Sequence, residues 1–159
     1  MIFRSIAWFV LLFALILFPK NLSASNKSQI VGEWEYIGFI YEGQIQPKPN
    51  PNFFLSFTFR LDDRVRLYWK RADEDFFCER VALFEFSQDR LWQEVVWVNP
   101  ENHGSCGSDP DMQMGRKTEN QIVIEDDILK IFMELNGKPF IYLLRQLPFA
   151  KASFYGSYL

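Results

Sequence analysis

The chain has 159 residues, a formal net charge of -3 and an aromatic content of 18%. This length suits one ordinary domain with a single core. A mildly acidic chain argues against nucleic-acid binding, which requires clustered Lys and Arg to neutralise phosphates. The many aromatic residues favour strands, because aromatic side chains suit a pleated and half-buried surface.

The first segment of the chain, residues 1–24, has the order of a secretory signal peptide. A short start carrying Arg4 precedes an uncharged apolar run over residues 5–19, and small residues follow at Ser23-Ala24-Ser25. The apolar run falls short of the roughly 20 residues that a membrane-spanning helix needs. We therefore expect cleavage and an exported protein, periplasmic or secreted, that does not span the membrane; an uncleaved anchor is the alternative.

The remaining chain contains eight segments with strand character, separated by turn residues. These segments cover residues 30–41, 53–60, 64–71, 77–86, 91–98, 112–125, 128–135 and 140–147. Asn136-Gly137 is the strongest hairpin signal, because both residues tolerate the positive φ of a type I′ turn. Eight strands joined mostly by tight turns can close into a barrel. We expect an all-β fold, an eight-stranded antiparallel up-and-down barrel over residues 25–147, followed by a tail over residues 148–159.

The two cysteines of the chain, Cys78 and Cys106, both lie in the exported part. In an oxidising compartment such a pair most often forms a disulfide, and free thiols or an intermolecular bond are the alternatives. The bridge would tie the Gly- and Ser-rich loop around Cys106 to a strand.

The polar face of the third segment carries Arg64, Arg66 and Lys70. A barrel embedded in an outer membrane would place this row in lipid, at a cost of about 2–4 kcal/mol per residue near the midplane. The charges therefore indicate a barrel with its polar face in water and its aromatic face inside.

Gly32-Glu33-Trp34 in the first segment and Arg145 in the last resemble the lipocalins and the wider calycin group. The resemblance implies a lipocalin-like barrel in which Trp34 and Arg145 form a structural lock rather than a ligand site. In such a lock the guanidinium lies flat over the indole at one end of the barrel.

Residues that could perform chemistry are few. His103 with Cys106, Asp109 and Asp111 could bind a metal only if Cys106 were a thiolate, which the disulfide prevents, so we expect no metal site. The acidic groups, which turn chemistry explains, are Asp62-Asp63, Asp73-Glu74-Asp75 and Asp126-Asp127. We expect neither an enzyme nor a cofactor, and a hydrolase that uses these loop carboxylates is the weakest alternative.

Inward-facing apolar and aromatic side chains are the remaining candidates for function. The predicted ligand-binding residues are Leu55, Phe57, Trp69, Trp97, Ile131, Met133 and Tyr142. A cavity lined by such groups suits a small hydrophobic ligand. The alternative is a filled barrel that binds an envelope protein through its surface loops, foremost residues 99–111.

Overall fold

The computed structural model describes residues 27–148, so the expected signal peptide and the expected tail beyond residue 148 lie outside the described residues. The strands are β1 (Gly32–Tyr41), β2 (Gln44–Pro47), β3 (Phe53–Phe59), β4 (Arg64–Arg71), β5 (Phe77–Ser87), β6 (Arg90–Val98), β7 (Lys117–Glu125), β8 (Ile128–Leu135) and β9 (Lys138–Gln146). Three short 3₁₀ helices accompany them: η1 (Lys27–Gln29), η2 (Gly104–Ser108) and η3 (Pro110–Met112). None of these helices is long and apolar enough to cross a bilayer.

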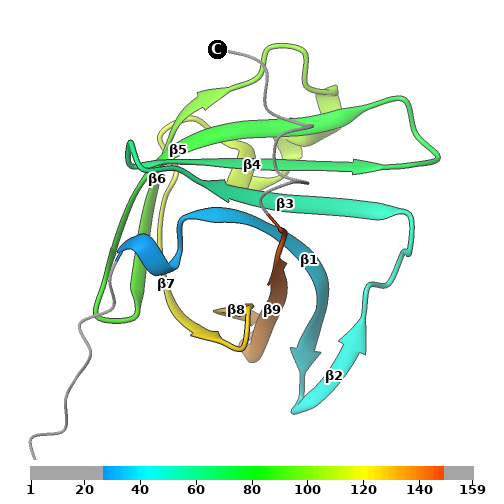
Figure 1. Cartoon of the computed structure of the whole chain (residues 1–159). Coiled ribbons are helices and arrows are strands. Elements are labelled where there is room, and N and C mark those ends of the chain that lie inside the picture. Colours follow the sequence, from blue (N-terminus) through cyan, green and yellow to red (C-terminus); the bar gives the residue numbers. More distant parts are fainter. Residues whose placement is uncertain (1–26, 149–159) are drawn as a thin grey trace, which may run out of the picture.

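The strands form one antiparallel sheet that closes on itself. Its order is β2-β1-β3-β4-β5-β6-β7-β8-β9, and β1 also pairs with β9. β1 and β3 to β9 therefore make a closed eight-stranded up-and-down barrel, as the sequence predicts (Figure 1). β2 is an additional strand within the segment that was expected to be a loop.

Local backbone geometry explains why the turn acids lie where they do. Asp63, Asp127 and Asn136 adopt left-handed backbone conformations, with φ of 62°, 62° and 54°. Short Asx side chains tolerate this region better than most residues, and Gly137 (φ 73°) completes the hairpin between β8 and β9. The acidic pairs between strands therefore serve chain reversal.

β1 divides one of its edges between two partners. Its residues Gly32 to Glu35 pair with β3, whereas Gly38 to Tyr41 pair with β2. Between these two halves, at Ile37, the pairing of β1 with β9 on its other edge has a register shift. The end of β1 therefore turns away from β3 together with β2, which opens one corner of the barrel (Figure 1). Gly38 permits this hairpin, because a Cβ at this position would collide with the backbone carbonyl of Gln46.

The opposite end of the barrel is closed. Trp34 is 1% exposed, and its Nε1–H donates to the carbonyl of Ile30 at 2.7 Å, just after η1. Lys27 of η1 pairs with Asp63 and donates to the carbonyl of Leu61 at 2.7 Å. Other fully buried side chains of the core are Phe59, Phe84, Leu91, Ile122, Leu129 and Leu144.

The closed end does not contain the lock that the lipocalin resemblance implies. Arg145 is exposed and lies opposite Glu35 in the ladder, on the outer face of the sheet. The Trp34 indole lies inside, opposite Gln146. Because neighbouring residues of a strand point to opposite faces, Arg145 cannot stack on Trp34. The indole is held by Ile30 instead.

Candidate functional site

A pocket of about 430 Å³ lies at the open corner of the barrel. It is lined by Tyr36, Phe39, Tyr41, Pro49, Asn50, Phe53, Arg71, Leu135, Phe140 and Tyr142. These residues come from β1, β3, β4, β8 and β9 and from the segment between β2 and β3. The volume falls within the range of about 300–1,000 Å³ typical of small-molecule sites.

The rings around the pocket contact one another. Tyr36 and Tyr142 meet edge to face with their centroids 5.2 Å apart, and Tyr142 meets Phe140 in the same way at 5.1 Å. Phe140 also stacks on Phe39 at 5.1 Å, and Tyr36 contacts Phe53 at 6.2 Å. Edge-to-face and offset contacts of this kind are favourable and hold the rings in place. The pocket therefore has a preformed aromatic wall.

Two of the three tyrosine hydroxyls of this wall, those of Tyr36 and Tyr142, are neutral at physiological pH. Burial, with a smaller contribution from Tyr142, raises the pKa of Tyr36 to about 12. Burial also raises the pKa of Tyr142, and the carboxylates of Asp111 and Asp109 add to this shift. Both phenols therefore keep their protons and remain hydrogen-bond donors at physiological pH.

Of the predicted ligand-binding residues, Tyr142 lines the pocket and the others lie elsewhere. Leu55, Phe57 and Ile131 are buried in the core, while Trp69 and Met133 pack against that core and are partly exposed. Trp69 approaches the pocket most closely, because its ring contacts that of Phe53 at 5.8 Å.

Trp97 differs most from its predicted position. It pairs with Val81 on the outer face of the sheet and is 39% exposed. The period of two that puts Leu91 and Val95 inside would also put Trp97 inside. However, the pairing of β5 with β6 skips Val96, and this bulge reverses the alternation.

Sequence reasoning missed most of the residues that form the pocket. Most of them lie near strand ends and in the segment between β2 and β3, where alternation alone does not show which residues meet. The concentration of aromatic residues at the ends of the first, second and last predicted strands was the available signal.

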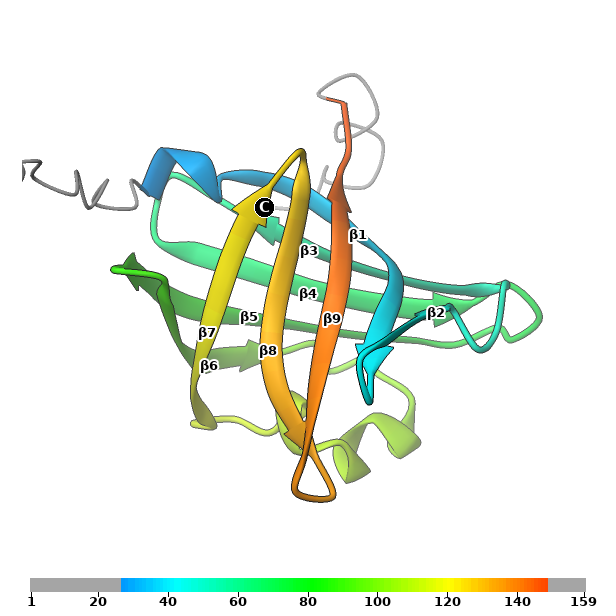
Figure 2. The same cartoon turned by 90° about the horizontal axis from the view of Figure 1, so that it is seen from below.

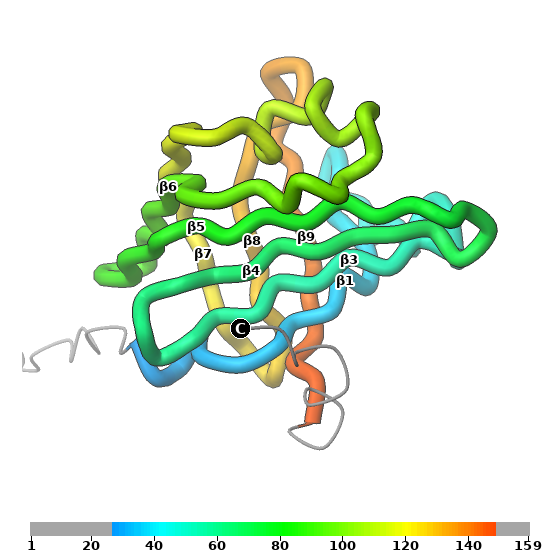
Figure 3. The backbone as a smooth tube through the Cα atoms, turned by 90° about the horizontal axis from the view of Figure 1, so that it is seen from above, coloured from blue at the N-terminus to red at the C-terminus, as the bar shows by residue number. Residues whose placement is uncertain are grey.

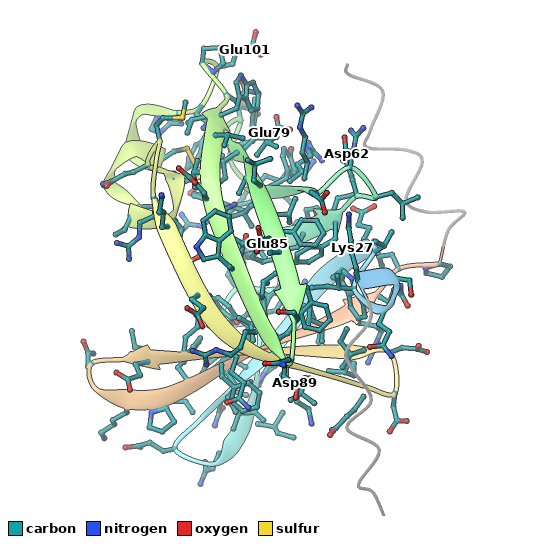
Figure 4. All side chains as sticks on the ribbon, turned by 90° about the vertical axis from the view of Figure 1, so that its left-hand side faces the viewer. Lys27, Asp62, Glu79, Glu85, Asp89 and Glu101 are labelled. Carbon is teal, nitrogen blue, oxygen red and sulfur yellow. A yellow bond between two sulfur atoms is a disulfide. The ribbon has the colours of Figure 1, made fainter. Side chains whose placement is uncertain are left out.

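The loop between β6 and β7 is fixed to the barrel near the pocket end. Cys78 of β5 and Cys106 of η2 form a disulfide with a Cα–Cα distance of 5.7 Å, as the sequence predicts. Asn102 exchanges hydrogen bonds with the backbone of Glu79 at 2.7 and 2.9 Å. The loop lies beside the β8–β9 turn (Figures 2 and 3), and Glu79 lies toward the same end as Glu101 (Figure 4).

The residues considered for a metal site have other roles in this loop. Cys106 is bound in the disulfide, and His103 stacks on Phe76 with ring centroids 4.4 Å apart. The Nδ1 of His103 lies 2.7 Å from the hydroxyl of Ser105. Within residues 27–148, no group of three or more His, Cys, Asp or Glu residues is arranged to hold a metal ion.

A buried carboxyl group lies on the opposite side of β1 from the pocket wall. Glu33 is 3% exposed, and its Oε1 has no hydrogen-bond partner. Burial raises the pKa of this carboxyl, although Arg66 and a hydrogen bond with Ser56 act in the other direction. At pH values between the normal and the raised pKa of Glu33, the folded state binds more protons than the unfolded state. The free energy of unfolding therefore falls as pH rises through this range.

We expect Glu33→Gln to raise the free energy of unfolding at pH 7 by about 1 kcal/mol and to flatten its decline above pH 4.5. Urea denaturation at several pH values measures both effects. Glu35→Gln is the matched control, because Glu35 is partly exposed and pairs with Lys48 at 3.5 Å. Equal pH profiles for Glu33→Gln and the unmodified protein would contradict the expectation.

No protein-family model matches this sequence, and none of the curated proteins is similar to it. The chemistry of the pocket is therefore the basis for assigning a function.

Proposed function

We propose that this protein is an exported, non-catalytic, lipocalin-like carrier that binds a small hydrophobic ligand at the open end of its barrel. The observation that supports this proposal is the pocket of about 430 Å³ with six aromatic side chains in its wall. A barrel closed at one end by η1 and Trp34 and open at the other also suits such a carrier. The disulfide is consistent with export.

The ligand sits at the mouth of the barrel rather than deep inside it. Leu55, Phe57 and Ile131, which would line a deeper cavity, are at most 8% exposed and belong to the packed core. The barrel is therefore filled in its middle and open at the corner beside Tyr36 and Phe53. This arrangement favours a compact or planar apolar ligand.

The composition of the pocket favours binding over hydrolysis. Its ten lining residues include no carboxylate, histidine, cysteine or serine. The turn acids that were considered for catalysis adopt backbone conformations that explain them, as at Asp63 and Asp127. Contact with an envelope protein through residues 99–111 is less favoured, because Asn102 and Cys106 are used to hold that loop on the barrel.

We expect N-phenylnaphthylamine, a neutral apolar probe, to bind with a saturable rise in fluorescence. Leu135→Arg should weaken this binding about tenfold, because it places a charge in the apolar pocket at a cost of about 1–2 kcal/mol. Leu135 is 47% exposed, so the fold should tolerate the substitution. Fluorescence titration provides the measurement.

The matched control for this experiment is Leu61→Arg. Leu61 is 77% exposed and lies in the β3–β4 turn at the closed end, away from the pocket. This variant should bind the probe as the unmodified protein does. A folded protein that shows no saturable signal, or equal weakening by both substitutions, would contradict the proposed function.

A further inference from the structure

Two tyrosine hydroxyls of the pocket wall have no hydrogen-bond partner in the described part of the protein. Tyr36 of β1 is 4% exposed, and Tyr142 of β9 is partly buried. Neither hydroxyl forms a hydrogen bond with another residue in the range 27–148. The hydroxyl of a buried tyrosine usually has such a partner. The two side chains therefore lack a group that accepts their hydrogen bonds.

Both hydroxyls can be reached from the pocket. Within residues 27–148, the polar side-chain atoms that are sealed from solvent without a partner are Oε1 of Glu33, Oε2 of Glu74 and Nε of Arg80. Arg80 is a buried residue of β5 that does not line the pocket. The two tyrosine hydroxyls are not among the sealed atoms, and both tyrosines line the pocket. Because the rings of Tyr36 and Tyr142 meet with centroids 5.2 Å apart, the pocket offers two donors on neighbouring side chains.

The other lining residues supply no free side-chain acceptor of comparable strength. Among the described residues that line the pocket, Asn50 is the one with a side-chain carbonyl, and its Oδ1 already accepts from the backbone N–H of Asn52 at 2.9 Å. Arg71 is the one charged residue of the lining, and a guanidinium only donates hydrogen bonds. Donors are therefore in excess, and a ligand has to supply the acceptor.

The charges near the pocket favour a neutral ligand over an acid. The Nη1 of Arg71 lies 2.9 Å from Oε1 of Glu74, so this guanidinium already has a counter-charge. The carboxylates of Asp111 and Asp109 act on the hydroxyl of Tyr142. Like charges repel, so an acid group that bound this hydroxyl would be destabilised by the same carboxylates. An uncharged acceptor avoids this repulsion.

An entering ligand changes the hydrogen bonding of the two phenols. A phenol in contact with water donates to the solvent. A purely apolar ligand that fills the pocket displaces this water, and each donor that is left unpaired costs about 1–3 kcal/mol. A carbonyl oxygen has two lone pairs and can accept from both hydroxyls at once. A ketone thus combines contact with the aromatic wall and pairing of both donors.

We propose that the ligand of this pocket is an uncharged, flat ketone whose carbonyl oxygen accepts hydrogen bonds from Tyr36 and Tyr142. Its ring system lies against the aromatic wall, where Phe39 and Phe140 stack on each other at 5.1 Å. This inference rests on the proposed function and specifies the chemical class of its ligand.

A fluorescent naphthyl ketone tests the inference. Prodan is uncharged and carries one carbonyl group, whereas N-phenylnaphthylamine is a neutral naphthalene without one. Tyr36→Phe and Tyr142→Phe should each weaken Prodan binding about 3- to 10-fold, the range for a neutral hydrogen bond, and the double variant about 10- to 100-fold. In each variant the loss for Prodan should exceed any loss for N-phenylnaphthylamine at least about twofold. Fluorescence titration measures both affinities.

Infrared spectroscopy measures the proposed hydrogen bonds directly. The stretching frequency of a carbonyl group falls when its oxygen accepts hydrogen bonds. We expect the lowest frequency for Prodan bound to the unmodified protein, a higher one in Tyr36→Phe and in Tyr142→Phe, and the highest in the double variant. Each substitution removes only an oxygen that makes no hydrogen bond within residues 27–148, and circular dichroism checks that the variants are folded.

The matched control is Tyr68→Phe. Tyr68 follows the core residue Leu67 in β4 and points to the outer face of the sheet, because neighbouring residues of a strand face opposite sides. It does not line the pocket. This variant should bind Prodan with the affinity of the unmodified protein and give the same carbonyl frequency.

The outcomes separate the two proposals. Failure of N-phenylnaphthylamine to bind contradicts the proposed function. If this probe binds, but Prodan does not bind or binds equally to the unmodified protein and the Tyr36 and Tyr142 variants, the present inference is overturned and the carrier function remains. Loss of Prodan binding confined to Tyr41→Phe would assign the carbonyl to another hydroxyl and would also overturn it. Tighter binding of anilinonaphthalene sulfonate than of Prodan, abolished by Arg71→Met, would instead identify the ligand as an acid and overturn the inference.

Discussion

Replacing Trp34 with alanine is expected to lower the free energy of unfolding by about 3–5 kcal/mol, the largest effect of any single substitution considered for this protein. Trp34 is 1% exposed at the closed end of the barrel. Its removal leaves a large cavity and also leaves the carbonyl of Ile30 without the indole N–H that it accepts at 2.7 Å. Urea denaturation followed by circular dichroism measures the loss.

The chain provides a matched control in Trp97. The same substitution at this position, which is 39% exposed on the outer face, should cost about 1 kcal/mol or less. Trp34→Phe then separates the hydrogen bond from the volume, because it retains most of the apolar contact. Similar losses for Trp34→Ala and Trp97→Ala would contradict the placement of the two side chains on opposite faces.

Removal of the disulfide is expected to have the second largest effect. The bond joins residues 28 positions apart, and the chain-entropy relation gives about 3–4 kcal/mol for a loop of this length. The double variant Cys78→Ala, Cys106→Ala should lose this amount in urea denaturation. Both sulfur positions are buried, so the variant also removes packing against β5.

Reduction of the unmodified protein supplies the control for this prediction. A thiol reductant should lower its urea midpoint toward that of the double variant and leave the midpoint of the double variant unchanged. An unmodified protein whose stability is the same with and without reductant, after free thiols have been counted, would show that the disulfide does not stabilise the fold.

Alternation and turn chemistry were sufficient to predict the barrel. The sequence of β3 alternates between inward and outward side chains, and Asn136-Gly137 marks the hairpin between β8 and β9. The expectation of export was enough to predict the pairing of Cys78 with Cys106. These features depend on residues that are close in the sequence or on composition, so they can be predicted from a single sequence.

The wrong predictions concern residues whose position depends on which strands pair and in which register. The bulge at Val96 turns Trp97 outward, and the end of β1 pairs with β2 instead of β3. Neither feature changes the local pattern of apolar residues. The periodicity of the sequence therefore cannot predict the bulge or the change of pairing partner. Arg145 was misplaced for a related reason, because its face is fixed by its register with Glu35.

For the candidate site, the sequence predicted the type of lining but few of the residues that form it. An aromatic lining was expected, but Tyr142 alone of the named residues belongs to the pocket. The sequence did not predict the burial of Arg80, because arginines are mostly exposed in folded proteins. Its burial follows from the inward face of β5, which is visible only once the strands are paired.

The pairing of β1 with β9 makes closure of the barrel depend on the last strand of the described residues. Tyr41 pairs with Phe140 and Trp34 with Gln146, so the ladder joins opposite ends of the described chain. Closing so long a loop is entropically costly, and folding becomes slower as the mean sequence separation of the contacts increases. Until β9 is available, β1 exposes an unpaired edge along most of its length, and a newly synthesised chain is most vulnerable to misassociation during that interval.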